Sequence, residues 1–454
     1  MIYMTFVCST VYSLIVLAAA YHTGILSLSG KNRFKYDSSP NKVFITEAVI
    51  FGLSLYLNLL LGILTATGDS YFFVSVMTRF TQSDTPFAGF YANNGISYPP
   101  LFNYIYYVIS LILKLFHVPI SYTSEPFILA VKLPGILCEF LMAWILYRYA
   151  KKNLPYGQTI PILLLTLLNP AYLLITAYIC QIDALYVFFM LLTVVLIYEK
   201  RLKLSYFAFA AAAMCKFQTI FMTPVIIYAV LREVFLHDFN WKKFREHLLT
   251  GLSAVFCMFL SYLPFVWDFS SGTFYKGGVT VNLTSSLKSY GLASQNTYNL
   301  WNLLGYNYLS EELYFGPFTC EAWGTIFLVL LVLLCSVLFY LHQNSLDIYP
   351  MLGAVLVSGT VCFATRMMAR YLYPAVPFLI LGFVLKPTRR RFLCALAYTI
   401  ALFLLNSFDY LIYPMDQYSA QLILPKIISV YVLGCFCFLV HTAIHEKDSE
   451  ANLK

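Results

Sequence analysis

The sequence predicts an all-α, polytopic membrane protein with about 12 or 13 transmembrane helices. Of its 454 residues, 60% are hydrophobic and only 11% are charged, whereas soluble domains carry about 25% charged residues. The mean hydropathy is +0.73. The apolar runs are long and do not alternate, which excludes a membrane barrel built from alternating segments of about 10 residues. A mostly helical backbone follows, because the lipid core offers its amide groups no water.

The placement of Lys and Arg predicts which loops are cytoplasmic. The loop after the first apolar run holds Lys31, Arg33, Lys35 and Lys42, with only Asp37 as an acid. Later basic clusters are Arg148 with Lys151 and Lys152, Lys200 with Arg201 and Lys203, Arg232 with Lys242, Lys243 and Arg245, and Lys386 with Arg389, Arg390 and Arg391. The N-terminus is therefore expected outside. The net charge of +8 comes from these loops, and we expect no nucleic-acid partner.

Apolar runs place the expected membrane spans along one transmembrane domain covering residues 1–454. The spans are expected at about 5–28, 43–65, 127–147, 159–176, 184–199, 204–215, 217–234, 248–267, 318–341, 347–364, 371–385, 392–412 and 423–443. Several are shorter than the ~20 residues of a straight crossing, which is typical of helices that line a cavity.

Two long outer-face loops interrupt these spans. Residues 67–126 form the first, and its apolar run 101–120 is expected to lie along or dip into the outer leaflet. If that run crossed the membrane, the cluster Arg148, Lys151 and Lys152 would lie outside, against the charge rule. Residues 268–317 form the second loop, and loops of that length are often functional.

The first outer loop contains the leading catalytic candidate. Asp69 follows Gly68 where the second apolar run ends, so it is either a catalytic base or substrate ligand, or an ordinary solvated acid. Asp84, between Ser83 and Thr85, is interpreted as a turn former. The loop closes with Ser97-Tyr98-Pro99-Pro100-Leu101. Its prolines fix the backbone as a rigid turn, as a helix start, or as both.

Charged residues at the ends of short spans are further candidates. Asp183, in Gln181-Ile182-Asp183, begins an apolar span, where an acid is functional by default or caps the helix starting at Ala184. Lys216, in Lys216-Phe217-Gln218, needs an anion such as a lipid phosphate, or a carboxylate. Its alternative is to extend its ammonium group to the interface.

Arg366 and Arg370 lie in an outer loop, where the charge bias disfavours them. If their segment is helical, the spacing of four residues puts both on one face. Guanidinium groups bind phosphate in a bidentate way, so phosphate binding is favoured over a structural pair. No HExxH motif occurs, and no Asp-x-Asp pair lies near Asp69, so we expect neither a metal nor another cofactor.

Taken in chain order, these elements resemble the GT-C superfamily of integral-membrane glycosyltransferases, over about residues 45–385. The matching elements are Gly68-Asp69, Phe90-Tyr91 with Ser97-Tyr98-Pro99-Pro100-Leu101, Asn169-Pro170 with Gln181-Ile182-Asp183, Lys216-Phe217-Gln218, Ser294-Gln295-Asn296-Thr297-Tyr298-Asn299-Leu300-Trp301 and Arg370-Tyr371-Leu372-Tyr373-Pro374. Three features depart from the family pattern. Met368-Ala369 stands where His-Glu is expected, Phe217 replaces a proline, and the first span is additional.

The resemblance implies an inverting glycosyltransferase acting at the outer membrane face. Asp69 would be the general base, and a polyprenyl-phosphate-linked sugar would be the donor to a glycan or lipid-linked acceptor. The implied donor-phosphate residues are Arg366, Arg370 and Lys216, and the implied substrate-binding residues are Tyr98, Gln181, Asp183, Gln218, Asn299, Trp301 and Tyr371.

Two other functions remain open from the sequence. A transporter or flippase of lipid-linked saccharide would share the arginines and aromatics but would not need Asp69. An oligosaccharide ligase would use Arg and His in a late outer loop, and residues 268–317 contain neither. We expect the bacterial plasma membrane and a cell-envelope acceptor first, and the endoplasmic reticulum membrane second.

Overall fold

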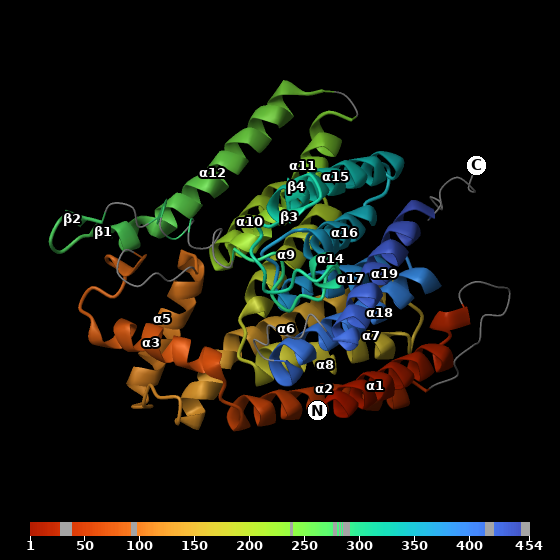
Figure 1. Ribbon diagram of the computed structural model, residues 1–454, viewed down its shortest axis with the longest axis horizontal. Coiled ribbons are helices and arrows are strands. Elements are labelled where there is room, and N and C mark those ends of the chain that lie inside the picture. Colours follow the sequence, from red (N-terminus) through yellow and green to blue (C-terminus); the bar gives the residue numbers. More distant parts are fainter. Residues whose placement is uncertain are drawn as a thin grey trace. The chain divides into compact units, whose positions relative to one another are not determined.

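The computed structural model is built from helices, with strands confined to two short hairpins among the residues it describes (Figure 1). Those residues are 1–27, 39–91, 98–236, 239–275, 279–280, 282, 284, 291–413 and 422–445. The predicted basic residues Lys31, Arg33 and Lys35, and Ser97 of the proline turn, lie outside them. The predicted all-α, polytopic membrane fold is confirmed.

Nine helical segments in the described part of the chain are long and apolar enough to cross a membrane. Six of them are single helices: Ile2–His22 (α1), Pro40–Leu64 (α2), Glu125–Asn153 (α6), Trp241–Val266 (α12), Cys320–Leu341 (α15) and Ile423–His445 (α19). Two others end or begin in a π- or 3-10 helix: Arg389–Ile412 comprises α18 (Arg389–Ser407) and the π-helix η5 (Phe408–Ile412), and Phe217–Val234 comprises the 3-10 helix η3 (Phe217–Met222) and α11 (Thr223–Val234). The last, Thr159–Tyr178, comprises α7 (Thr159–Thr166), α8 (Pro170–Tyr172) and the π-helix η2 (Leu173–Tyr178). The chain is therefore an integral membrane protein.

Five shorter apolar helical segments occur in the described residues, and the last four of them lie at the remaining expected spans. They are Pro100–Leu115 (α5), Asp183–Tyr198 (α9), Leu202–Cys215 (α10), Ile348–Phe363 (α16) and Ala369–Leu385 (the 3-10 helix η4 Ala369–Leu372 and α17 Ala375–Leu385). Other elements are η1 (Ile25–Ser27), α3 (Gly68–Gln82), α14 (Leu300–Leu303), and the hairpins of β1 (Trp267–Asp268) with β2 (Thr273–Phe274) and β3 (Tyr314–Phe315) with β4 (Phe318–Thr319).

Helix α5 is short and has one buried and one exposed face. Its 16 residues span about 24 Å, less than the ~30 Å of a hydrocarbon core. Phe102, Tyr106 and Ser110 are buried at a spacing of four residues, whereas Val108 and Ile112 are exposed. One face of α5 thus packs on protein and the other is apolar and open. Its position along the outer leaflet stays a prediction.

The chain forms two compact units, each assembled from separate stretches of sequence. Unit 1 comprises Met1–Leu57, Glu139–Ile175 and Tyr290–Lys454. Unit 2 comprises Asn58–Cys138 and Thr176–Ser289. The single transmembrane domain over residues 1–454 stays a prediction.

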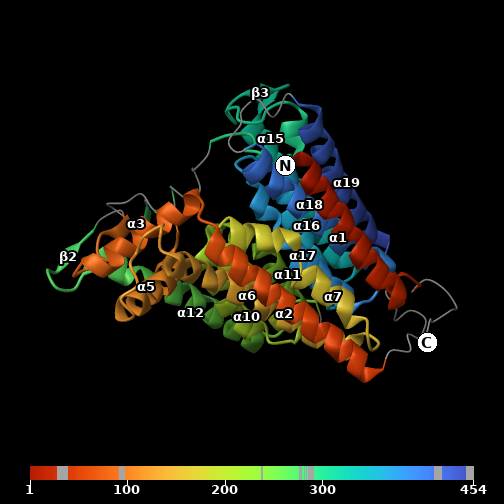
Figure 2. The same cartoon turned by 90° about the horizontal axis from the view of Figure 1, so that it is seen from below.

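In unit 1, α15 to α19 form a bundle in which successive helices pack against one another (teal to blue in Figure 1). Helix α1 packs against α18 and α7, alongside this bundle (Figure 2). The buried guanidinium of Arg391 ties the bundle together at one end. It donates to the Asp347 carboxylate before α16 and to the Gly382 carbonyl in α17, both at 2.7 Å. A buried cation is stable there because each contact satisfies a guanidinium N–H.

In unit 2, α9 and α10 form a closely packed helical hairpin. Helix α10 also packs against α5 and α12, and α5 packs against α3. The antiparallel β1–β2 hairpin follows α12 directly, with Trp267 paired to Phe274. These contacts place the start of α3, the start of α9 and the end of α10 in one unit, and these are the positions of Asp69, Asp183 and Lys216.

Candidate functional site

Asp69 lies in the first turn of α3 and directly contacts Gln181. The Gln181 amide Nε2 donates a hydrogen bond to the Asp69 carboxylate, across 112 residues of sequence. Asp69 is half-buried and Gln181 is buried. An acid in the first turn also interacts favourably with the positive end of the helix. The carboxylate is thus held in place by a side chain that was predicted independently from another motif.

The backbone on either side of this pair is tied together by threonine side chains. Thr67 precedes α3, and its hydroxyl donates to the Ile179 carbonyl at 2.5 Å. The buried Lys132 in α6 donates to the Thr65 carbonyl at 2.6 Å and the Thr65 hydroxyl at 2.8 Å. Lys132 thereby binds the carbonyl end of α2, where a cation is favourable. These contacts fix the segment before Asp69 against the segment before Gln181.

We predict that Thr67→Val lowers the free energy of unfolding by about 1 kcal/mol, because it removes one neutral hydrogen bond. Denaturant unfolding in detergent micelles measures this change. Ser75→Ala is the matched control, because Ser75 is exposed in α3, the helix that Thr67 precedes, and bonds only the nearby Phe72 carbonyl among its described contacts. Equal stabilities for the two variants would contradict the anchoring role of Thr67.

Asp183 and Lys216 form a buried ion pair. The Lys216 ammonium contacts the Asp183 carboxylate at 2.6 Å and lies 5.2 Å from the centre of the Tyr186 ring. Helix α9 begins at Asp183 itself, one residue before the start expected at Ala184. Lys216 is buried, so the prediction that it extends to the interface is wrong. Its partner is the carboxylate that the sequence left open as one alternative.

The proline segment is a helix start, and its action as a rigid turn stays a prediction. Pro99 precedes α5, and Pro100 is its first residue. The Tyr98 carbonyl accepts hydrogen bonds from the Tyr91 hydroxyl at 3.0 Å and the Asn103 amide at 3.1 Å. The Tyr98 ring stacks on Phe102 at 4.4 Å. Substrate contact by Tyr98, and by the half-buried Gln218 in η3, stays a prediction.

Arg366 and Arg370, in unit 1, do not share a helical face, because the segment that contains Arg366 is not helical. Residue 366 has a positive φ of 62°, a conformation that breaks a right-handed helix, and the 3-10 helix η4 begins only at Ala369. The Arg366 guanidinium forms a bidentate pair with Glu311, with Nε 2.7 and 2.8 Å from the two oxygens. It also contacts Glu321 at 3.1 Å.

The Glu311 carboxylate stabilises the charged form of the Arg366 guanidinium. Hydrogen bonds to Glu311 raise the pKa of the Arg366 guanidinium above its ordinary value. The contact also fixes the side chain within the second outer loop, since Glu311 precedes β3. A role for Arg366 in donor-phosphate binding stays a prediction, and two carboxylates already occupy this guanidinium.

Arg370 donates a hydrogen bond to the hydroxyl of Tyr410 in η5, and its guanidinium lies 5.8 Å from the centre of the Tyr371 ring. Three residues after Arg370, the buried Tyr373 hydroxyl donates to the Glu139 carboxylate at 2.7 Å. The Tyr373 ring also packs against Tyr172 at 4.4 Å. The Arg370–Tyr373 segment therefore places the Arg370 guanidinium beside aromatic rings. Through Tyr373 it also hydrogen-bonds the buried Glu139 carboxylate.

Asn299 and Trp301, predicted to bind substrate, are both fully buried. The Asn299 side chain caps α14 by accepting from the Trp301 and Asn302 amides, and donates to the Val361 carbonyl at 3.1 Å. The Trp301 indole donates to the Phe363 carbonyl at 3.0 Å. These contacts join the second outer loop to the end of α16. Substrate contact by either residue stays a prediction.

The sequence prediction missed Glu139 and left Lys132 unassigned. Both lie within α6, an otherwise apolar helix, and both are buried. A charged residue inside a membrane span is functional by default, so the signal that could have found them was present. What the sequence does not reveal is the partner, since Tyr373 lies 234 residues from Glu139.

No cluster of three or more His, Cys, Asp or Glu residues that could hold a metal occurs within the described residues. The described groups in unit 2 are carboxylates, an amide and lysine ammonium groups, and those in unit 1 are guanidinium groups with carboxylates and tyrosine hydroxyls. No protein-family model and no curated protein sequence matches the chain.

Proposed function

We propose that the chain is an inverting glycosyltransferase. It moves a sugar from a polyprenyl-phosphate donor to a glycan or lipid-linked acceptor at the extracytoplasmic membrane face. The observation that supports this best is the convergence of four predicted site residues in unit 2. Gln181 binds Asp69, and Asp183, two residues further on, binds Lys216. These residues come from three separate motifs of the resemblance.

In the proposed reaction, Asp69 is the general base. The acceptor hydroxyl loses its proton to the Asp69 carboxylate while its oxygen attacks the anomeric carbon of the donor. The bond between that carbon and the phosphate oxygen breaks, and the polyprenyl phosphate leaves with the bonding electrons. One displacement inverts the anomeric configuration. Gln181 orients the carboxylate by its hydrogen bond.

The leaving phosphate gains negative charge as the bond breaks, and a cation stabilises it. We place Arg370 first in this role, because its guanidinium lies against the hydroxyl of Tyr410 and the ring of Tyr371. Arg366 and Lys216, which each bind a carboxylate in the structure, are the further candidates for this role. A bidentate guanidinium suits phosphate geometry better than an ammonium does.

The donor class follows from the membrane setting. Soluble nucleotide sugars are cytoplasmic, so a reaction at the outer face draws its sugar from a lipid carrier. We propose a cell-envelope glycan acceptor in a bacterial plasma membrane first, and a lipid-linked glycan in the endoplasmic reticulum second.

The experiment that tests this function is a sugar-transfer assay with the purified chain in proteoliposomes. The donors are a panel of polyprenyl-phosphate sugars carrying a radiolabelled sugar. We expect label in the acceptor and release of polyprenyl phosphate. Label that crosses the bilayer on its lipid, without transfer, would instead identify a flippase.

A further inference from the structure

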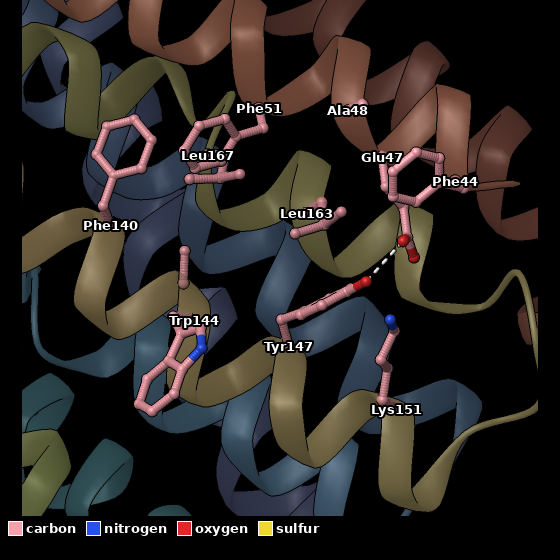
Figure 3. A pocket seen from close by; sticks show the side chains of 11 residues that line it. Phe44, Glu47, Ala48, Phe51, Phe140, Trp144, Tyr147, Lys151, Leu163 and Leu167 are labelled. Carbon is pink, nitrogen blue, oxygen red and sulfur yellow. Dashed lines mark hydrogen bonds between the residues drawn. The ribbon is translucent and has the colours of Figure 1, made fainter.

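A pocket of about 270 Å³ lies in unit 1, and no residue assigned to sugar transfer lines it (Figure 3). Helices α2, α6 and α7 line it. Its walls are apolar and aromatic, with Phe44, Phe51 and Trp144 each more than half exposed. Exposed aromatic side chains on membrane helices face lipid rather than water, so a lipid can reach this pocket.

One end of the pocket is polar. Glu47 accepts hydrogen bonds from the Tyr147 and Thr159 hydroxyls, both at 2.6 Å. The Lys151 ammonium lies 4.7 Å from the centre of the Tyr147 ring, and Figure 3 shows its side chain beside Tyr147 at this end. The Arg148 guanidinium lies 5.0 Å from the centre of the Trp144 ring.

The charges at this end favour an anion. The exposed Lys151 lines the pocket at this end, and the exposed Arg148 lies beside the lining residue Trp144 in the same helix. The Glu47 carboxylate accepts hydrogen bonds from two hydroxyl groups. It therefore repels an anion less than a carboxylate without such donors would. Lys152 and Lys42 add positive charge on the same ends of α6 and α2.

The polar end lies at the membrane face that the charge rule makes cytoplasmic. Lys42 is in the first turn of α2, and Lys151 and Lys152 are in the last turn of α6. The apolar walls extend from there toward the membrane interior, along α2 from Phe44 to Phe51. A bound molecule must therefore combine an apolar chain with an anionic group at the cytoplasmic surface.

We propose that this pocket binds an anionic glycerophospholipid of the cytoplasmic leaflet. One acyl chain occupies the pocket against Trp144 and Phe51, and the phosphate contacts Lys151 and Arg148. Anionic lipids of that leaflet attract Lys and Arg near the membrane surface. This site is separate from the proposed donor site, and the inference does not depend on sugar transfer.

The test is native mass spectrometry of the purified full chain, titrated with phosphatidylglycerol, phosphatidylcholine or inorganic phosphate. We expect phosphatidylglycerol to bind at least about tenfold more tightly than phosphatidylcholine. Arg148→Gln/Lys151→Gln should lose at least about tenfold in affinity for phosphatidylglycerol. Its matched control is Lys242→Gln/Lys243→Gln, which removes two exposed cations in unit 2 and should leave that affinity unchanged.

A second variant tests the apolar part of the pocket. Ala48 lines the pocket and is exposed, so Ala48→Trp fills the pocket without disturbing a packed core. We expect it to abolish binding of phosphatidylglycerol. Val49→Trp is its control, because Val49 is 60% exposed and does not line the pocket.

Three results would overturn the proposal. Equal affinity for the two lipids would remove the anionic selectivity, and equal binding of inorganic phosphate would replace the lipid by a free anion. A dimer of the wild type that dissociates in Ala48→Trp, with lipid binding unchanged, would make a second copy the occupant.

Discussion

Asp69→Asn is expected to lower the rate of sugar transfer by at least about a hundredfold, because it removes the general base. The asparagine keeps the size of the side chain and can still bond Gln181 after its amide rotates, so the fold should persist. Transfer in proteoliposomes, at matched amounts of folded protein, measures the effect. The loss should appear in kcat, since the proton moves only during the reaction.

Asp84→Asn is the matched control for that variant. Asp84 is an exposed acid that follows the end of α3, the same helix that Asp69 begins. We expect it to transfer sugar at the wild-type rate. If Asp69→Asn and Asp84→Asn both keep that rate, Asp69 is a structural acid, and Asp183 becomes the next candidate base.

Lys216→Met is expected to destabilise the protein by about 3–5 kcal/mol, because it leaves the Asp183 carboxylate buried without its ion-pair partner. The two side chains are only 6% and 0% exposed, so water cannot replace the lost contact. Lys203→Met is the control, since Lys203 and Glu246 form a pair of the same 2.6 Å length with side chains 49% and 42% exposed. That variant should lose about 0–1 kcal/mol.

The double variant Lys216→Met/Asp183→Leu separates the effect of the ion pair on protein stability from its effect on the rate of sugar transfer. Replacing both members of a buried ion pair by apolar groups is often neutral, so we expect most of the lost stability to return. If Lys216 also acts on substrate, sugar transfer stays low in this stable variant. A single Lys216→Met variant as stable as the wild type would contradict the structural importance of the pair.

The spans were predictable because lipid imposes a simple requirement on the chain. A segment of about 20 apolar residues must be helical, and the runs expected at 318–341 and 423–443 became Cys320–Leu341 and Ile423–His445. The exact ends were less predictable. Helix α6 extends to Asn153, because its basic last turn lies beyond the apolar run that marked the span.

The partners within the candidate site were not predictable. The hydrogen bond between Gln181 and Asp69 joins residues 112 positions apart, and spacing along the chain carries no signal for such a contact. The sequence did indicate that Lys216 needs an anion, because a buried ammonium is costly. It could not indicate whether a lipid phosphate or Asp183 supplies the charge.

Arg366 shows where a local rule failed for a physical reason. A spacing of four residues suggests one helical face, but the guanidinium is bound by Glu311, in the 268–317 segment, and by Glu321, in the first turn of α15. These tertiary contacts hold residue 366 at a positive φ and end the regular backbone there. The sequence did not indicate this role for Glu311 or Glu321, because each lies more than 40 positions from Arg366.

The anomeric configuration of the product is the measurement that tests the proposed glycosyl transfer most directly. The purified chain in proteoliposomes is given a polyprenyl-phosphate sugar of known configuration, and nuclear magnetic resonance identifies the anomer of the transferred sugar. A single displacement with Asp69 as base predicts the inverted anomer, and almost none of it with Asp69→Asn. A retained anomer would contradict the single displacement. Absence of product, with lipid-linked saccharide crossing the bilayer, would contradict the transferase itself.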